Sequence, residues 1–308
     1  MPSQTPYRGR FAPSPTGELH FGSLITAVAS YLQAKHQHGE WLLRIDDIDP
    51  PREQKGATKT IISTLENFGF EWDQDILYQS HNRQQHQDIV QQLLAQQKAY
   101  PCSCSRKSIL EKTGQKKGQV IYPGFCRQGP LQNLSAPATP SIRLHCQQQT
   151  ICFNDLIQGK QTIELEKTRG DFVIQRSDGY FSYQLASGFD DAEQGITEVV
   201  RGSDLLSDTP CQIHLQNSLN LINPQYCHIP IVVNHLGQKL SKQNHAKPIK
   251  QKESVPLLYK SLQLLGQNPP SSLLNVKQDE LWLWAISHWQ LDLIPKKLYQ
   301  SGKNQVKA

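Results

Sequence analysis

The segment that most constrains this fold is 10–24, which reads Arg-Phe-Ala-Pro-Ser-Pro-Thr-Gly-Glu-Leu-His-Phe-Gly-Ser-Leu. It predicts a strand that ends near Phe11, a loop rich in proline and glycine, and a helix that begins near His20. Such a junction directs several backbone N–H groups and the positive end of a helix dipole at one point, which suits a phosphate group. The segment therefore favours an α/β domain that binds a nucleotide.

Length and composition are consistent with a cytoplasmic protein of about two domains, since the chain has 308 residues. The sequence holds no apolar run near the roughly 18 residues that cross a bilayer, and no secretory signal, so we expect no membrane partner. Its seven cysteines are odd in number and unevenly spaced, which favours free thiols or a metal over disulfides. The net charge of +5 permits nucleic-acid binding without requiring it.

The N-terminal part of the chain alternates between strand and helix patterns. Apolar residues at helical spacing follow the first loop as far as Gly39, and 41–45 reads as a buried strand. The polar segment 46–52 follows that strand, and a second helical pattern covers 54–68. This alternation is typical of a doubly wound parallel sheet, whose ligands lie beyond the carboxyl ends of its strands. The first loop and the polar segment both belong to that edge.

The pattern breaks between 100 and 141, where Cys, Gly and Pro replace periodic apolar residues. We expect an inserted subdomain there, followed by short strands up to about residue 166. The α/β pattern then resumes, with a helix predicted for about 207–219 and a strand for 228–233. Beyond about residue 248 the chain is expected to be mainly helical, ending in an amphipathic stretch at 281–293.

Two motifs, His20-Phe-Gly-Ser23 and Lys239-Leu-Ser-Lys-Gln243, resemble the two signatures of class I aminoacyl-tRNA synthetases. When ATP activates a carboxylate, negative charge builds on the phosphates and on the leaving pyrophosphate, and positive groups lower that barrier. We expect His20 to act in catalysis at the helix N-terminus, with Gly22 and Ser23 beside the ATP. Lys239 and Lys242 would close over the pyrophosphate. The alternative interpretation is an ordinary surface histidine and a solvated lysine turn.

The segments 10–17, 44–49 and 190–204 resemble the glutamyl subgroup of that class. A side-chain carboxylate is best recognised by the planar fork of an arginine, and Arg10 and Arg201 are the candidates. The resemblance implies a glutamate pocket lined by Arg10, Phe11, Ala12, Pro13, Ser14, Asp46, Tyr183 and Arg201.

Position 46 departs from the subgroup, whose members usually carry Glu where this chain has Asp46. A carboxylate there would hold the substrate ammonium, and the shorter side chain would need a water bridge or help from Asp47. Arg201 has a structural alternative, an ion pair with Asp204 or Asp191. Asp204 itself is expected to cap a helix rather than to act in catalysis.

The inserted segment carries Cys102-Ser-Cys104 and Tyr122-Pro-Gly-Phe-Cys126. Three thiols and a phenol can complete a tetrahedral metal site, although tyrosine is a rare ligand and three free thiols are the alternative. The resemblance implies one structural Zn²⁺ held by Cys102, Cys104, Tyr122 and Cys126. Four protein ligands would leave no open position for catalysis.

The other cysteines have simpler expected roles. Cys146 and Cys152 are alternative ligands if the tyrosine does not bind the metal. Cys211 and Cys227 read as ordinary core thiols, which is the commoner role of a free cysteine.

Only 65 residues follow Gln243, fewer than the helical anticodon-binding region of a full glutamyl-tRNA synthetase needs. The chain therefore resembles the truncated glutamyl-Q tRNA(Asp) synthetase family. That family activates L-glutamate with ATP and Mg²⁺ and esterifies it to the cyclopentene-diol of queuosine, the wobble base of tRNA(Asp). The anticodon stem-loop would itself enter the active site, and we expect a monomer.

The resemblance divides the chain into four parts: 1–97 and 171–247 as the two halves of a Rossmann-like catalytic domain, 98–170 as a zinc-binding, acceptor-type insert, and 248–308 as a short helical region without an anticodon-binding domain. Three other functions are the alternatives. They are charging of the 3′ end of a tRNA, non-catalytic tRNA binding, and nucleotidyl transfer by a small enzyme that shares the phosphate motif.

Overall fold

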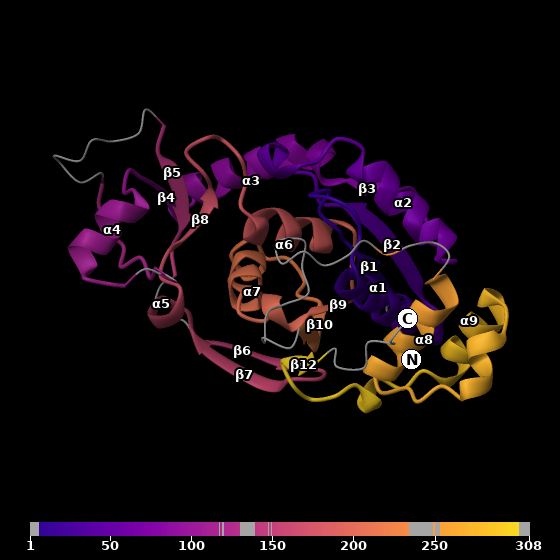
Figure 1. The fold of residues 1–308 in the computed structure, drawn as a ribbon. Helices are drawn as coiled ribbons and strands as arrows, with labels where there is room; N and C mark the ends of the chain where they lie inside the picture. The colour runs from indigo at the N-terminus through magenta and orange to yellow at the C-terminus, as the bar shows by residue number, and fades with distance from the viewer. Residues whose placement is uncertain are drawn as a thin grey trace.

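The computed structural model describes residues 6–116, 118, 120–129, 139–146, 148, 150–233, 249 and 253–301. A parallel sheet lies at the centre, an antiparallel sheet with α4 (Arg106–Thr113) lies at one end, and α8 (Ser254–Leu264) and α9 (Gln278–His288) lie at the other (Figure 1). Lys239 and Lys242 lie outside the described residues. No helix in these ranges is both long and apolar enough to span a membrane.

The central sheet has two halves, which meet where β1 (Arg8–Phe11) lies beside β9 (Glu198–Gly202). The strands, in spatial order, are β3 (Leu77–Tyr78), β2 (Glu40–Ile45), β1 (Arg8–Phe11), β9 (Glu198–Gly202), β10 (Gln225–Ile229) and β6 (Thr150–Asp155). Pairing within each half is parallel, and the backbone N–H of Thr197 joins the halves by donating to the carbonyl of Arg8 at 2.9 Å. The expectation of an α/β fold built on a parallel sheet is confirmed.

Helix α1 (Phe21–His36) covers β1, β2 and β9 with one apolar face. Leu24, Val28 and Leu32 recur every four residues on that face and are 0–1% exposed. Helices α8 and α9 pack on α1 and contribute to the same hydrophobic core. Trp282 and Trp289 anchor this C-terminal region, because their indole N–H groups donate to the carbonyl of Phe68 and the side chain of Gln33 at 2.9 and 2.7 Å.

The inserted segment forms its own small layer. The antiparallel sheet of this layer combines β4 (Ala99–Cys102) and β5 (Ser141–Leu144) with β8 (Phe172–Gln175), which follows the predicted insert in the chain. The hairpin of β6 and β7 (Gly159–Glu164) connects this layer to the central sheet, where β6 pairs with β10 (Figure 1). The remaining elements are α2 (Ala57–Asn67), α3 (Arg83–Ala95), α5 (Leu165–Thr168), α6 (Tyr183–Glu193), α7 (Thr209–Ser218), β11 (Ile231–Val233) and β12 (Tyr299–Ser301).

Two predicted helices differ in extent from the observed ones. Helix α2 begins at Ala57, three residues later than predicted, because the preceding Gly56 adopts a left-handed conformation with φ of 83°. The predicted helix at 281–293 is wrong at its end, since α9 stops at His288 and Trp289 turns into an extended conformation that buries its ring. The domain boundaries at residues 97, 170 and 247 stay predictions.

Candidate active site

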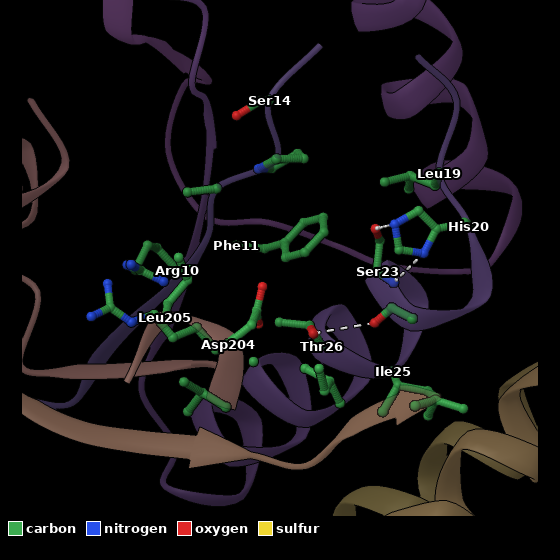
Figure 2. A pocket seen from close by; sticks show the side chains of 18 of the residues that line it. Arg10, Phe11, Ser14, Leu19, His20, Ser23, Ile25, Thr26, Asp204 and Leu205 are labelled. Atoms are coloured by element: carbon green, nitrogen blue, oxygen red, sulfur yellow. Dashed lines mark hydrogen bonds between the residues drawn. The ribbon is translucent and has the colours of Figure 1, made fainter. Parts of the chain in front are cut away.

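A cavity of about 460 Å³ opens where β1 runs into the first helix (Figure 2). One wall comes from β1, the following loop and the start of α1, and the opposite wall comes from β9, η3 (Ser203–Leu205) and the first residue of α6. Most of the predicted substrate residues line it, namely Arg10, Phe11, Ala12, Pro13, Ser14, His20, Gly22, Ser23, Tyr183 and Arg201. Asp46 is the only described residue of the predicted substrate site that does not line this cavity.

His20 caps the helix that begins at this cavity. Its backbone is extended, with φ of −114° and ψ of 168°, and its Nδ1 accepts from the backbone N–H of Ser23 at 3.2 Å. Because Nδ1 accepts, the neutral ring carries its proton on Nε2, which lies 3.1 Å from the Ser23 hydroxyl. The ring is half-buried in the cavity wall (Figure 2). This geometry places an imidazole at the positive end of the helix dipole, where an anion is favoured.

Arg10 is bound to a carboxylate within the protein. Its Nε and Nη2 donate to the two carboxylate oxygens of Asp191 at 2.9 and 3.2 Å, and its side chain is 4% exposed. Burial alone would raise the pKa of Asp191, but the charges of Arg10 and Arg44 outweigh it and lower that pKa to about 2. The positive charge of Arg10 is therefore balanced before any substrate arrives.

Asp46 lies behind the cavity, not in its wall. It is 7% exposed and accepts from Nε of Arg44 at 2.8 Å, while Arg44 also donates to Asp191 at 2.8 Å. Burial raises the pKa of Asp46 to about 6 despite the charge of Arg44. Asp47, the alternative carboxylate, is engaged elsewhere, because it accepts from the backbone N–H and the hydroxyl of Ser80 at 2.7 Å each.

Arg201 has a different environment from Arg10. It is 3% exposed, and its fork donates to three neutral acceptors: His228 Nε2 at 3.0 Å, the Tyr183 hydroxyl at 3.2 Å and Thr209 Oγ1 at 2.8 Å. The ion pairs found among the described residues do not include Arg201, so neither of its predicted structural partners holds it. The charges of Asp191 and Asp208 act on Arg201 from beyond ion-pair distance. A buried cation without a carboxylate in contact favours a site that takes up an anion.

Sequence reasoning missed the pair behind Arg201. His228 Nδ1 lies 2.5 Å from an oxygen of Asp155, and both side chains are fully buried. Since Nε2 accepts from Arg201, the proton of the imidazole lies on Nδ1 and is donated to Asp155. Burial lowers the pKa of His228 to about 4, so the ring is neutral at neutral pH. No local motif marks these residues, which meet only because β6 pairs beside β10.

The four predicted metal ligands converge in the insert. The sulfurs of Cys102, Cys104 and Cys126 lie within 4.8 Å of one another, and the Tyr122 hydroxyl lies 3.2 Å from Cys102 Sγ and 3.7 Å from Cys104 Sγ. Ligand sulfurs on a tetrahedral zinc are separated by ~3.8 Å for Zn–S bonds of about 2.3 Å. The separation of 3.6 Å between the sulfurs of Cys104 and Cys126 matches that spacing. The donor set therefore fits a metal ion such as zinc.

The remaining cysteines do not join this cluster. Cys146 is buried in a separate core, and Cys152 is exposed on β6. Cys211 and Cys227 are 1% and 0% exposed, as expected for core thiols. The group that could hold a metal ion among the described residues is thus Cys102, Cys104 and Cys126, with the Tyr122 hydroxyl beside it.

Comparisons with known proteins identify the family of this chain. The family model described as tRNA synthetases class I (E and Q), catalytic domain, matches residues 7–267. The glutamyl-Q tRNA(Asp) synthetase of Aromatoleum aromaticum is 46% identical over 95% of this chain and 92% of the relative. That of Chromobacterium violaceum is 44% identical over 94% of this chain and 95% of the relative.

A solved structure also resembles this chain, at a lower sequence identity. A glutamate tRNA ligase from Elizabethkingia meningosepticum, in complex with its amino acid, superposes with a TM-score of 0.78 and 25% identity. The match covers 95% of this chain and 66% of that ligase, so this chain spans slightly less than two thirds of its length.

Proposed function

Because this chain belongs to the glutamyl-Q tRNA(Asp) synthetase family of class I tRNA synthetases, we propose that it activates L-glutamate with ATP and transfers it to queuosine in tRNA(Asp). In the first step the α-carboxylate of glutamate attacks the α-phosphorus, which forms glutamyl-adenylate and releases pyrophosphate. In the second step a hydroxyl of the queuosine cyclopentene-diol attacks the activated carbonyl, which forms an ester and releases AMP.

The observation that carries this proposal is the buried fork of Arg201, which lines the cavity and makes no ion pair among the described residues. Its guanidinium fork would bind the side-chain carboxylate of glutamate, and Tyr183, already 3.2 Å away, would share that contact. Glutamine, which has a neutral amide, would leave this buried cation without a counter-ion. Recognition by charge therefore favours an acidic amino acid over its amide.

The opposite side of the glutamate site is assigned to β1 and the loop after it. Arg10 would contact the substrate from β1, and the loop from Phe11 to Ser14 would shape the pocket. Asp46, which is paired with Arg44, would act on the substrate ammonium. In this role Asp46 acts from behind the cavity wall.

ATP would occupy the helix end of the same cavity. His20 and the N-terminus of α1 would stabilise the charge that develops on the phosphates, and Gly22 would let the adenosine approach the backbone. Ser23 would hold the imidazole in place through its two contacts with the ring. Lys239 and Lys242 are proposed for the leaving pyrophosphate, and Mg²⁺ would accompany ATP as part of the substrate.

The cysteine cluster is proposed to hold one structural zinc ion through Cys102, Cys104, Tyr122 and Cys126. A bound zinc supplies folding free energy to its segment and would deprotonate its thiol ligands. A backbone bridge supports the tyrosine: Tyr122 pairs with Gly170, where φ is 64° and an added Cβ would collide with the Tyr122 carbonyl oxygen. Only glycine fits this approach.

The acceptor is proposed to be the anticodon stem-loop of tRNA(Asp), bound by a cytoplasmic monomer. A splayed loop presents its bases to a protein pocket, whereas a base inside a helix is inaccessible. The test is incubation of the protein with labelled glutamate, ATP and tRNA(Asp) from queuosine-replete and queuosine-free cells. Label confined to the queuosine-replete tRNA supports the proposal.

Other outcomes of this labelling experiment would indicate a different function. Equal labelling of both tRNAs, or label on the 3′ end of tRNA(Glu), would identify a tRNA-charging enzyme instead. A protein that binds tRNA without glutamate-dependent exchange of pyrophosphate into ATP would be a non-catalytic relative.

A further inference from the structure

A second concave site lies on the insert, away from the proposed active site. It is a hollow of about 380 Å³ beside α4 and the metal-binding cluster. Its lining residues are Arg106, Ile109, Gly118, Val120, Tyr122, Arg143 and Arg169. Three of these are arginines, and none of these described lining residues is acidic.

Arg143 is the buried cation of this hollow. It is 9% exposed, its guanidinium lies 3.9 Å from the centroid of the Tyr122 ring, and Nη1 donates to the carbonyl of Asp171 at 2.8 Å. Its Nε has no hydrogen-bond partner, and Arg143 is absent from the ion pairs of the described residues. Arg127 nearby takes both available carboxylates, those of Asp171 and Glu166, at 2.6 and 3.0 Å. Among the described residues, no carboxylate pairs with Arg143.

The other two arginines differ in how far their charges are balanced. Arg169 pairs with Asp208 at 2.8 Å and also donates to Ser207. Arg106 is exposed at the first turn of α4 and donates to the carbonyl of Gly118, which is a neutral acceptor. Two of the three arginines thus pair with no carboxylate in the part of the chain that the structure describes, and their planar donor groups suit an oxyanion.

We propose that this hollow binds a backbone phosphate of the RNA substrate. The proposal rests on the proposed function, which makes RNA the polyanion that meets this surface. The insert lies at the end of the molecule opposite α8 and α9 (Figure 1). A phosphate contact of this kind positions the RNA without reading its sequence.

The test compares Arg106→Gln and Arg143→Gln with the control Lys107→Gln. Lys107 is the next residue of α4, its side chain is 87% exposed, and it does not line the hollow. We expect each arginine variant to raise the KM for tRNA several-fold, with the KM values for glutamate and ATP unchanged. The dependence of log kcat/KM on log salt should become shallower by about 0.9, the value for one lost phosphate contact. The control should match the wild-type protein.

Arg106→Gln decides the outcome, because Arg106 is exposed and its loss does not affect the core. A wild-type KM and salt slope in this variant, or the same loss in Lys107→Gln, would overturn the proposal. A raised KM for ATP would instead identify a nucleotide as the occupant. If the wild-type protein itself transfers no glutamate to tRNA(Asp), the proposed function is wrong, and this result is distinct from a failure of the phosphate site alone. Metal content and melting temperature of Arg143→Gln separate an RNA effect from damage to the adjoining metal cluster.

Discussion

The guanidinium Nε of Arg201 donates to Nε2 of His228 over 3.0 Å, so the buried cation is held by a neutral ring and not by a carboxylate. This partner fixes the position of the fork without cancelling its charge. Arg10, bound by both oxygens of Asp191, shows the opposite arrangement in the facing wall of the same cavity. The two arginines should therefore respond differently to substitution.

Replacing Arg10 is expected to affect stability more than replacing Arg201. Arg10→Ala leaves the buried carboxylate of Asp191 with one arginine fewer, and breaking a buried ion pair costs about 3–5 kcal/mol. Arg201→Ala orphans no carboxylate among the described residues, so its main effect should be a higher KM for glutamate. Urea unfolding and steady-state kinetics measure the two effects. Equal losses of stability in both variants would contradict this assignment.

Asp155→Asn is expected to weaken glutamate binding through His228. The wild-type carboxylate accepts the Nδ1 proton and so presents a bare Nε2 to Arg201. An amide can instead donate to Nδ1, which moves the ring proton to Nε2 and opposes the Arg201 N–H. We expect the KM for glutamate to rise by roughly ten-fold, the effect of losing one charge-assisted hydrogen bond, with a smaller effect on ATP.

The fold should survive this substitution. The amide oxygen of the substituted side chain would still accept from the backbone N–H groups of Ile157 and Gln158, which now bind Asp155 Oδ1 at 3.1 and 2.8 Å. Asp155→Ala, which loses those bonds as well, is the comparison for structural damage. Parallel increases in the KM values for glutamate and ATP would argue against a role in positioning Arg201.

The stability of the protein is expected to fall as pH rises through about 7 because of Glu198. Burial raises the pKa of this carboxyl from 4.5 to about 7. The stabilisation associated with the protonated form is complete below pH 4.5 and is lost as pH rises through the folded-state pKa. Between about pH 5 and pH 8 the wild-type protein should lose roughly 2–3 kcal/mol more unfolding free energy than Glu198→Gln. Urea titrations across that range test it, and parallel profiles would refute the assignment.

Tyr122→Phe is expected to weaken metal binding while keeping the ring in its core. The phenylalanine removes the hydroxyl that lies 3.2 Å from Cys102 Sγ but leaves the ring that Arg143 covers. The purified wild-type chain should carry one zinc ion, and the variant should release it faster to a chelator, with a lower melting temperature. Cys152→Ser, at an exposed cysteine outside the cluster, should keep the wild-type metal content. Unchanged release in the tyrosine variant would exclude Tyr122 as a ligand.

The sequence predicted best those parts of the site that are contiguous or closely spaced. Residues 10–23 form one strand-to-helix junction, so local patterns suffice to bring Arg10 and His20 to one cavity. The four ligands of the proposed metal site lie within 25 residues and meet as expected.

Partnerships between distant segments could not be predicted from local patterns. Asp191 is a predicted partner of Arg201, but it binds Arg10 and Arg44, because the choice depends on which strand residues face Asp191 in the folded chain. Asp155 and His228 are separated by 73 residues and become neighbours only through the pairing of an inserted strand with the central sheet. No periodicity or spacing encodes such a contact.

The packing of α9 on α1 has a consequence for how the chain folds during synthesis. Trp289 donates to Gln33 across 256 residues of sequence, and Trp282 packs in the same core as Tyr31 and Phe70. The outer face of α1 therefore stays open to solvent until nearly the whole described chain has left the ribosome. Because contacts of such long sequence separation form late and slowly, the nascent chain should need protection of this apolar face for most of its translation.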